Sequence, residues 1–236
     1  MIRLRSTLFN LGMLVFTPLY TLVILLSFPL PPLMRYRVIR PWSRIMLAWL
    51  RLTCKLDFRV LGGENIPTRP SIVLAKHQSA WETLALQSIF PPQVWVMKRE
   101  LLRLPFFGWA LALSSPIAID RGSSRLALKQ LLDQGKERLA RGFWVVIFPE
   151  GTRIEPGGKG RYKVGGAWLA THTGALAVPV AHNAGEFWGR NAFLKRPGTI
   201  TVSIGAPIDP AGLKADELNS RVEAWIENEM AHLHEK

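Results

Sequence analysis

The sequence of 236 residues contains only one cysteine, Cys54. A single cysteine excludes a disulfide framework within the chain and a cysteine-rich metal cluster, which fits a reducing compartment. The five histidines show no spacing typical of zinc ligands, so we expect no metal site. Internal repeats and low-complexity linkers are also missing. A hydrophobic content of 48% with 20% charged residues is typical of a folded chain.

Charge is missing from the N-terminal segment, where no residue between Ser6 and Met34 is acidic or basic. The almost wholly apolar run 11–28 within this uncharged segment meets the requirement of about 20 apolar residues for a membrane-spanning helix. Pro18 lies inside this run and is expected to kink a helix, so embedding in one leaflet fits as well as spanning. A cleaved signal peptide is the competing interpretation. The long apolar region and the prolines that follow it argue against cleavage.

Acidic residues are scarce: 17 Asp and Glu stand against 30 Lys and Arg, which gives a formal charge of +13. This excess predicts an anionic partner such as phosphates or an acidic lipid surface. Arginines gather after the apolar run, at 35, 37, 40 and 44. By the positive-inside tendency, this cluster places the main domain on the cytoplasmic face of the inner membrane. The apolar segment argues against a nucleic-acid partner.

Residues 41–55 have the pattern of an amphipathic helix. Its apolar members are Trp42, Ile45, Met46 and Trp49, and its cations are Arg44, Arg51 and Lys55. Such a helix either lies in the lipid headgroup layer or packs its apolar stripe on the protein core. Both interpretations stay open. We therefore expect a membrane-associated helical segment over residues 1–57.

Short apolar runs alternate with helical patterns over residues 58–236, which predicts one α/β domain with a mixed, largely parallel sheet flanked by helices. Strands are expected at 71–75, 94–97, 117–119, 144–148, 177–180 and 199–204. Helices are expected at 81–89, 105–113, 124–140, 165–172 and 215–234. Functional side chains in such sheets gather where loops leave the carboxyl ends of strands.

His77 and Glu82 follow the first of these strands in the stretch Ala75-Lys-His-Gln-Ser-Ala-Trp-Glu-Thr83. Ser79 and Glu82 match the capping-box pattern, with Ser79 as the N-cap of the next helix. The turn before that helix lets His77 meet the Glu82 carboxylate, so His77 can act as a general base. An ordinary helix cap beside a surface histidine is the simpler interpretation of these nine residues alone. Ser79 lacks the glycine-flanked elbow of a serine nucleophile.

A second group of polar residues follows another expected strand, in Phe148-Pro-Glu-Gly-Thr-Arg153. Glycine allows close backbone approach, and the guanidinium group of Arg153 can bind an anion through a fork of donors. Arg121 follows a third strand in the same way. Two such arginines can share one phosphate. Each stretch by itself is equally explained as a turn at the end of a strand with a solvated arginine.

Taken together and in order, these blocks resemble the four motifs of the glycerolipid acyltransferases. The blocks are His77 to Glu82, Ile117-Ala-Ile-Asp-Arg121, Phe148-Pro-Glu-Gly-Thr-Arg153 and Ala177-Val-Pro-Val180. The resemblance covers roughly residues 60–205, and four ordered blocks are far more specific than any one of them. It implies an enzyme that transfers a fatty acyl group to the sn-2 hydroxyl of 1-acylglycerol 3-phosphate.

The resemblance also implies roles for individual residues. His77 would be the general base and Glu82 its acidic partner, where the family usually has aspartate. Arg121 and Arg153 would hold the acceptor phosphate in a site shaped by Glu150, Gly151 and Thr152. The donor would be an acyl thioester carried on coenzyme A or on acyl carrier protein, with no cofactor. Direct transfer without an acyl-enzyme is then expected.

Two other functions remain open on the sequence. The acceptor is alternatively glycerol 3-phosphate or another lysolipid, in which case a headgroup without phosphate leaves the arginines without an obvious ligand. A non-catalytic protein that binds anionic membrane lipids is the alternative from a different class. Replacing His77 with glutamine separates these interpretations, because only an enzyme would lose its function. The oligomeric state is undetermined.

Overall fold

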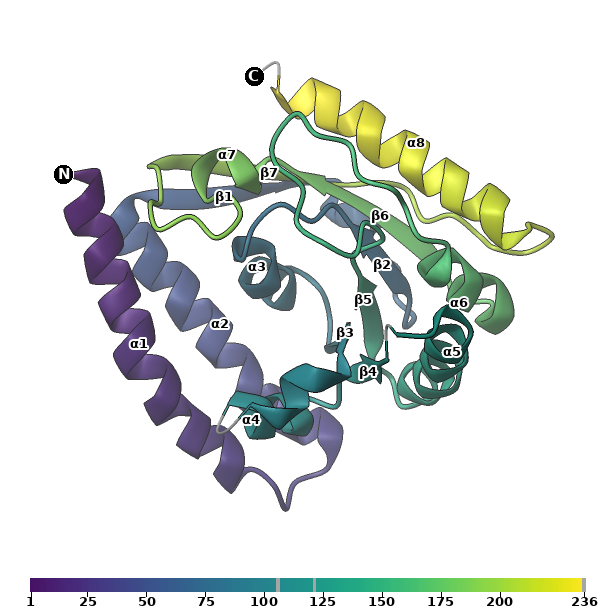
Figure 1. Ribbon diagram of the computed structural model, residues 1–236, viewed down its shortest axis with the longest axis horizontal. Coiled ribbons are helices and arrows are strands. Elements are labelled where there is room, and N and C mark those ends of the chain that lie inside the picture. Colours follow the sequence, from purple (N-terminus) through teal and green to yellow (C-terminus); the bar gives the residue numbers. More distant parts are fainter. Residues whose placement is uncertain (105–106, 121, 235–236) are drawn as a thin grey trace.

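A mixed sheet of seven strands organises the chain (Figure 1), which confirms the expected α/β fold. The computed structural model describes residues 1–104, 107–120 and 122–234. The strand order is β1-β7-β6-β2-β5-β3-β4, and only the β6–β7 pair is antiparallel. The strands are β1 (Leu56–Leu61), β2 (Ile72–Ala75), β3 (Gln93–Lys98), β4 (Ile117–Ile119), β5 (Trp144–Ile147), β6 (Ala177–His182) and β7 (Gly198–Ile204).

Helices cover both faces of the sheet, which explains why its central strands are apolar throughout. In β2, Val73 packs toward α1 (Ile2–Leu26), α2 (Pro32–Cys54) and α3 (Trp81–Ile89). Its neighbours Ile72 and Leu74 pack toward α5, α6 and α8 on the other face. These helices are α5 (Ser124–Ala140), α6 (Gly165–Thr173) and α8 (Ala215–His234). The alternation follows from the period of two in a strand.

Shorter elements complete the fold. They are the helices α4 (Phe107–Leu113) and α7 (Ala184–Phe187) and the 3₁₀ turns η1 (Gly63–Asn65) and η2 (Arg99–Arg103). The helix expected at 105–113 matches α4 over its described part, and residues 105 and 106 lie outside the described residues. The bounds expected for α3, α5 and α8 agree with the structure.

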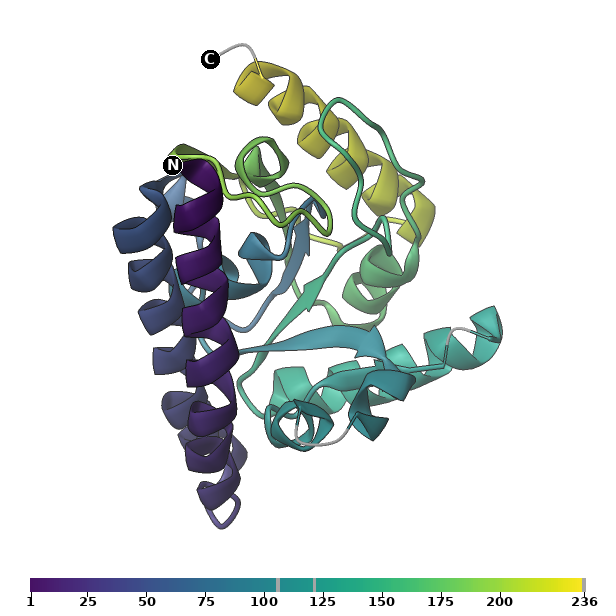
Figure 2. The same ribbon diagram turned by 60° about the vertical axis from the view of Figure 1, so that its left-hand side comes forward.

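The two N-terminal helices run side by side at one edge of the molecule (Figure 2). The helix expected to begin at Pro41 begins instead at Pro32 and contains Pro41. Proline is favoured in the first helical turn because it needs no amide partner there, and Pro32 takes that position. Helix α1 continues through Pro18 and is long and apolar enough to cross a membrane. The division of the chain after residue 57 stays a prediction.

The outer side of α1 carries exposed apolar side chains, whereas polar groups fix its inner side. The exposed residues include Leu4, Leu8, Leu11, Leu14, Leu19, Leu22 and Leu26. On the inner side the buried Lys195 ammonium donates to Asn10 Oδ1 at 2.7 Å and lies 4.7 Å from the centre of the Trp188 ring. The Lys195 amide donates to Ser6 Oγ at 2.9 Å. A helix face that exposes this many leucines marks an interaction surface and indicates association with a membrane.

Strand β1 was not expected from the sequence. Its residues Leu56-Asp-Phe-Arg-Val-Leu61 alternate between apolar and polar, which is the usual signal of a half-buried strand. The strand pairs in parallel with β7, which is the last strand along the chain. A short alternating run directly after a long helix is easily missed, because its partner strand is far away in the sequence.

Candidate active site

The general-base candidate His77 and two polar residues near it, Glu150 and His182, lie at the carboxyl ends of neighbouring strands. His77 comes just after β2, Glu150 comes just after β5, and His182 is the last residue of β6. Strands β2, β5 and β6 run in parallel, so their carboxyl ends meet at the same edge of the sheet. Glu82 lies in the first turn of α3, which begins close to the end of β2. The topology thus brings the first and third sequence blocks together, as expected for an α/β sheet.

His77 and Glu82 form a direct contact. The His77 Nδ1 atom lies 2.7 Å from Glu82 Oε1. The Glu82 side chain is fully buried, whereas the His77 side chain keeps 15% of its surface exposed. A carboxylate accepts only, so Nδ1 carries the hydrogen of the neutral imidazole and Nε2 is left with a free lone pair. This arrangement suits a general base.

The turn before α3 creates this contact. Glu82 Oε1 also accepts hydrogen bonds from the amides of Gln78 at 3.0 Å and Ser79 at 2.9 Å. Ser79 Oγ accepts from the Trp81 amide at 3.0 Å. The expected N-cap at Ser79 is therefore one residue too early, because Ala80 is the N-cap, although Glu82 makes the backward bond of a capping box. The buried Ser79 hydroxyl serves the turn, which disfavours a nucleophilic role.

Glu82 stays ionised although it is buried. Burial alone would raise the pKa of its carboxyl group. The hydrogen bond from His77, the electrostatic influence of the neighbouring His182 and His77 rings, and the Ser79 amide outweigh burial and hold the pKa of Glu82 below its usual value. The carboxylate is therefore charged at neutral pH and can stabilise a proton on His77.

An aromatic stack fixes the plane of the His77 ring. The ring lies parallel to Phe148, with 4.0 Å between ring centres and 12° between planes. Phe148 in turn stacks on Trp95 of β3 at 5.6 Å. Because Nδ1 is tied to Glu82 and one face is covered by Phe148, the imidazole has little freedom to rotate. The sequence contains no local signal for this stack, since its three members lie within β3, after β2 and after β5.

The segment from Glu150 to Ile154 is hydrogen-bonded to the backbone of His77 on both sides. Glu150 Oε2 accepts the His77 amide at 3.0 Å, and the Ile154 amide donates to the His77 carbonyl at 2.7 Å. Gly151 makes the turn between them with φ of +68°, a conformation that favours glycine. Arg153 directly precedes Ile154, so the structure brings this arginine next to the histidine-bearing turn.

Of the other residues predicted to bind the phosphate, the structure describes Thr152 and Arg153. Thr152 is exposed on the same turn as Gly151. Arg153 is partly buried, and its carbonyl accepts a hydrogen bond from Arg190 Nη1 at 3.3 Å. Arg121 lies outside the described residues, so the expected pair of arginines stays a prediction. No group of three or more metal-ligating side chains is found within the described ranges.

Two buried residues next to the dyad were missed from the sequence. Lys76 precedes His77 and is 1% exposed. His182 is fully buried and bridges the backbone: its Nε2 donates to the Lys76 carbonyl at 2.9 Å, and its Nδ1 accepts from the Ala184 amide at 3.3 Å. A lysine directly after an apolar strand could have been recognised in the sequence as a candidate for a buried charge near the site. His182 offered none, since one histidine in a strand is usually a satisfied core residue.

The buried His182 predicts a loss of stability on acidification. Burial lowers the pKa of His182 below its usual 6.5, and the neutral ring satisfies both of its hydrogen bonds. The unfolded chain then binds a proton that the folded chain does not, so stability is full above pH 6.5 and falls below it. At about pH 5.5 the loss is at most on the order of 1 kcal/mol.

Thermal unfolding in detergent between pH 7 and 5.5 measures this effect. His182→Gln keeps one donor and one acceptor but does not titrate, so its melting temperature should fall less on acidification than that of the wild type. Equal pH dependence in the two proteins would show that His182 is not the responsible group.

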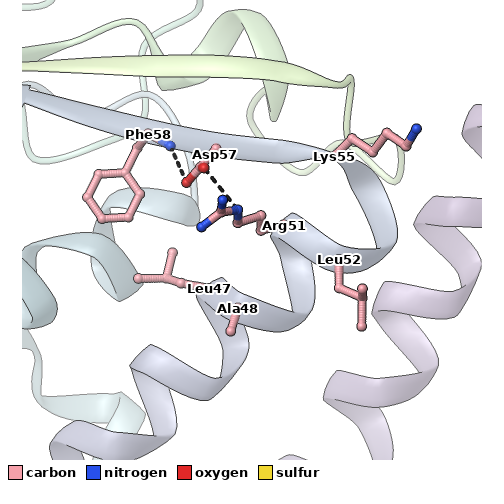
Figure 3. A pocket seen from close by; sticks show the side chains of 7 residues that line it. All are labelled: Leu47, Ala48, Arg51, Leu52, Lys55, Asp57 and Phe58. Atoms are coloured by element: carbon pink, nitrogen blue, oxygen red, sulfur yellow. Dashed lines mark hydrogen bonds and ion pairs between the residues drawn. The ribbon is translucent and has the colours of Figure 1, made fainter.

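A separate hollow of about 600 Å³ lies between the end of α2 and the start of β1 (Figure 3). Arg51 and Asp57 form an ion pair of 3.1 Å across it. The lining residues are Leu47, Ala48, Arg51, Leu52, Lys55, Asp57 and Phe58. None of the predicted catalytic or phosphate-binding residues lines this hollow, so it is not the place where His77 acts.

Comparisons with known proteins identify relatives of this chain. The model of the family described as Acyltransferase matches residues 57–183. A 1-acyl-sn-glycerol-3-phosphate acyltransferase of Pseudomonas aeruginosa is 48% identical over 216 residues, which is 88% of this chain and 84% of that protein. The human 1-acyl-sn-glycerol-3-phosphate acyltransferase beta is 30% identical over 66% of this chain and 56% of its own length.

The fold is also similar to a solved structure. The crystal structure of the 1-acyl-sn-glycerophosphate acyltransferase of Thermotoga maritima aligns with a TM-score of 0.81 and 25% sequence identity. The alignment covers 99% of this chain and 96% of that one, so it includes the N-terminal helices. The resemblance stated from four sequence blocks is confirmed, and the chain is a member of the Acyltransferase family.

Proposed function

We propose that this enzyme transfers a fatty acyl group from a thioester donor to the sn-2 hydroxyl of 1-acylglycerol 3-phosphate, which gives phosphatidic acid. The similarity to the P. aeruginosa enzyme, whose name specifies this acceptor, carries the choice of substrate. The contact of His77 with a buried, ionised Glu82 supports the chemistry. The donor carrier is coenzyme A or acyl carrier protein, and no cofactor takes part.

His77 moves the proton in this mechanism. Its Nε2 removes the proton from the sn-2 hydroxyl as the oxygen attacks the thioester carbonyl carbon. Glu82 stabilises the imidazolium that forms, through the bond to Nδ1. When the tetrahedral intermediate collapses, the carbon–sulfur bond breaks and the imidazolium returns the proton to the thiolate. Acyl transfer is thus direct, and no acyl-enzyme is needed.

The Glu150–Ile154 turn supports the binding of the acceptor. It is hydrogen-bonded to both sides of the His77 backbone, so a phosphate held by Arg153 would lie at a fixed distance from the general base. Arg121 is proposed as the second phosphate ligand on the family resemblance alone. Gly151 and Thr152 shape the turn from which Arg153 extends.

The N-terminal helices support attachment to the cytoplasmic leaflet of the inner membrane. Helix α1 packs along α2, which carries four arginines between 35 and 44 and continues directly into β1. A helix that crosses the bilayer would draw these charges into the hydrocarbon region, which is costly. We therefore propose that α1 lies in one leaflet, with its exposed leucines among the acyl chains and the exposed Arg37 and Arg44 of α2 at the headgroups.

A panel of acceptors tests the proposed substrate. The purified enzyme in detergent would receive lysophosphatidate, a monoacylglycerol with the same chain, and lysophosphatidylethanolamine, with each thioester donor. We expect kcat/KM for lysophosphatidate to exceed that for the monoacylglycerol by about 100-fold or more, because only the former carries a dianionic phosphate. Preference for another lysolipid would reassign the acceptor, and no transfer to any acceptor would contradict the function.

A further inference from the structure

Lys76 places a buried charge directly beside the catalytic turn. Its ammonium group lies 2.8 Å from Glu150 Oε1 and 2.8 Å from Glu227 Oε1. Both Lys76 and the Glu150 side chain are almost completely buried, whereas the Glu227 side chain is 21% exposed. A charge in the protein interior is tolerated only when it is paired. The lysine therefore depends on both carboxylates, and they depend on it.

These contacts form a continuous path from the C-terminal helix to the general base. Glu227 lies on α8 and pairs with Lys76, which is 151 positions earlier in the chain. Lys76 pairs with Glu150 through one carboxylate oxygen, and the other oxygen accepts the His77 amide. Each partner in the path is held within about hydrogen-bonding distance, so a displacement of α8 is passed on to the backbone of His77.

The path also fixes the loop that connects β5 to α6. The Tyr162 hydroxyl donates to Glu227 Oε1 at 2.7 Å, and the Lys76 ammonium lies 3.4 Å from the Gly158 carbonyl. Burial and the bond to Glu227 raise the pKa of Tyr162, so the hydroxyl is a permanent donor. The loop that begins with the phosphate-binding turn is thus anchored to the same carboxylate as Lys76.

We propose that Lys76 and Glu227 are positioning residues, through which helix α8 holds the Glu150 carboxylate and thereby the His77 backbone in the orientation needed for proton transfer. Glu227 lies beyond residues 57–183, over which the family model matches. This role therefore extends the active site to a helix outside the matched region. The inference rests on the proposed function.

We expect replacement of Lys76 to lower kcat more than replacement of Glu227. Lys76→Met leaves Glu150 buried without its cation, so its carboxyl group takes up a proton or turns away from the His77 amide. Glu227→Gln leaves the Lys76–Glu150 pair in place and removes only the outer charge. We expect kcat to fall by about 100-fold in the first variant and about tenfold in the second.

The chain offers a matched control. Lys159 and Glu223 form an ion pair of 2.9 Å between the same loop and the same helix, but the Lys159 side chain is 62% exposed. An exposed pair of this kind contributes little. Lys159→Met should keep kcat within about twofold of the wild type.

The pH profile of kcat separates positioning from a general loss of folded protein. The titratable groups that face the Glu150 carboxyl group are Lys76, His77, Tyr162, His182 and Glu227. In Lys76→Met, activity should recover as the pH rises, because Glu150 is again ionised and again accepts the His77 amide. Because buried His182 makes the fold less stable at low pH, a partly unfolded enzyme would also lose activity on acidification, so the profiles are compared only at pH values where thermal unfolding shows each variant to be fully folded.

The experiment is acyl transfer to lysophosphatidate by the full-length wild type, Lys76→Met, Glu227→Gln and Lys159→Met, with thermal unfolding measured for each. A fall in kcat for the first two variants, with the acid limb of Lys76→Met moved to higher pH, is the expected result. If Lys76→Met does not fold, Glu227→Gln decides. Glu227→Gln with the activity of Lys159→Met would overturn the inference, whereas an inactive wild type would overturn the proposed function instead.

Discussion

Replacing His77 with alanine is expected to lower kcat for acyl transfer by about 10³-fold to 10⁴-fold, because no other described side chain occupies its place between Glu82 and the open edge of the sheet. The effect should fall on kcat, since the phosphate of the acceptor is recognised elsewhere. The measurement is steady-state transfer of a labelled acyl group to lysophosphatidate in detergent.

His172 supplies the control for this prediction. It lies exposed on α6, where its Nδ1 contacts the Trp168 carbonyl at 2.8 Å, away from Glu82. His172→Ala should transfer acyl groups at the wild-type rate. A fully active and folded His77→Ala protein would rule out His77 as the general base.

Replacing Arg153 with alanine is expected to raise KM for lysophosphatidate and to lower kcat/KM by about 100-fold, with little change in KM for the thioester donor. The reason is the loss of a guanidinium group on the turn that is bonded to His77 through Glu150 and Ile154. Initial rates measured against each substrate in turn distinguish the two KM values.

Arg69→Ala is the matched control for the arginine. Arg69 is exposed before the start of β2, at the end of the strand opposite to His77. Its loss removes one positive charge from the protein without touching the proposed phosphate site, so KM should be unchanged. If Arg153→Ala and Arg69→Ala behaved alike, the acceptor phosphate would have to be held by other residues.

The local parts of the site could be predicted from the sequence. A capping pattern after an apolar strand was enough to predict the bend that joins His77 to Glu82, because caps depend on residues a few positions apart. The alternation of strands and helices was enough to place His77 at the carboxyl ends of the parallel strands. The N-cap is Ala80, one residue later than expected, although the Ser79 hydroxyl and the Glu82 carboxylate still make the two hydrogen bonds of the capping pattern.

The long-range parts could not be predicted. Lys76 and Glu227 are 151 positions apart, and neither sits in a pattern whose period indicates a partner. The same holds for Lys195, which reaches Asn10 on α1 over 185 positions. Such pairs follow from the packing of whole helices on the sheet, and propensity or periodicity carries no information about them.

The His77–Glu82 pair is the centre of the proposed acyl transfer to lysophosphatidate. Its most direct test is the formation of labelled phosphatidic acid by the wild type beside Glu82→Gln, with both thioester donors. Glutamine keeps an acceptor for the three donors that Glu82 Oε1 binds but removes the charge. We predict phosphatidic acid from the wild type and about 100-fold less from the folded variant. Equal rates would contradict the role of the pair, and no phosphatidic acid from either donor would contradict the proposed reaction.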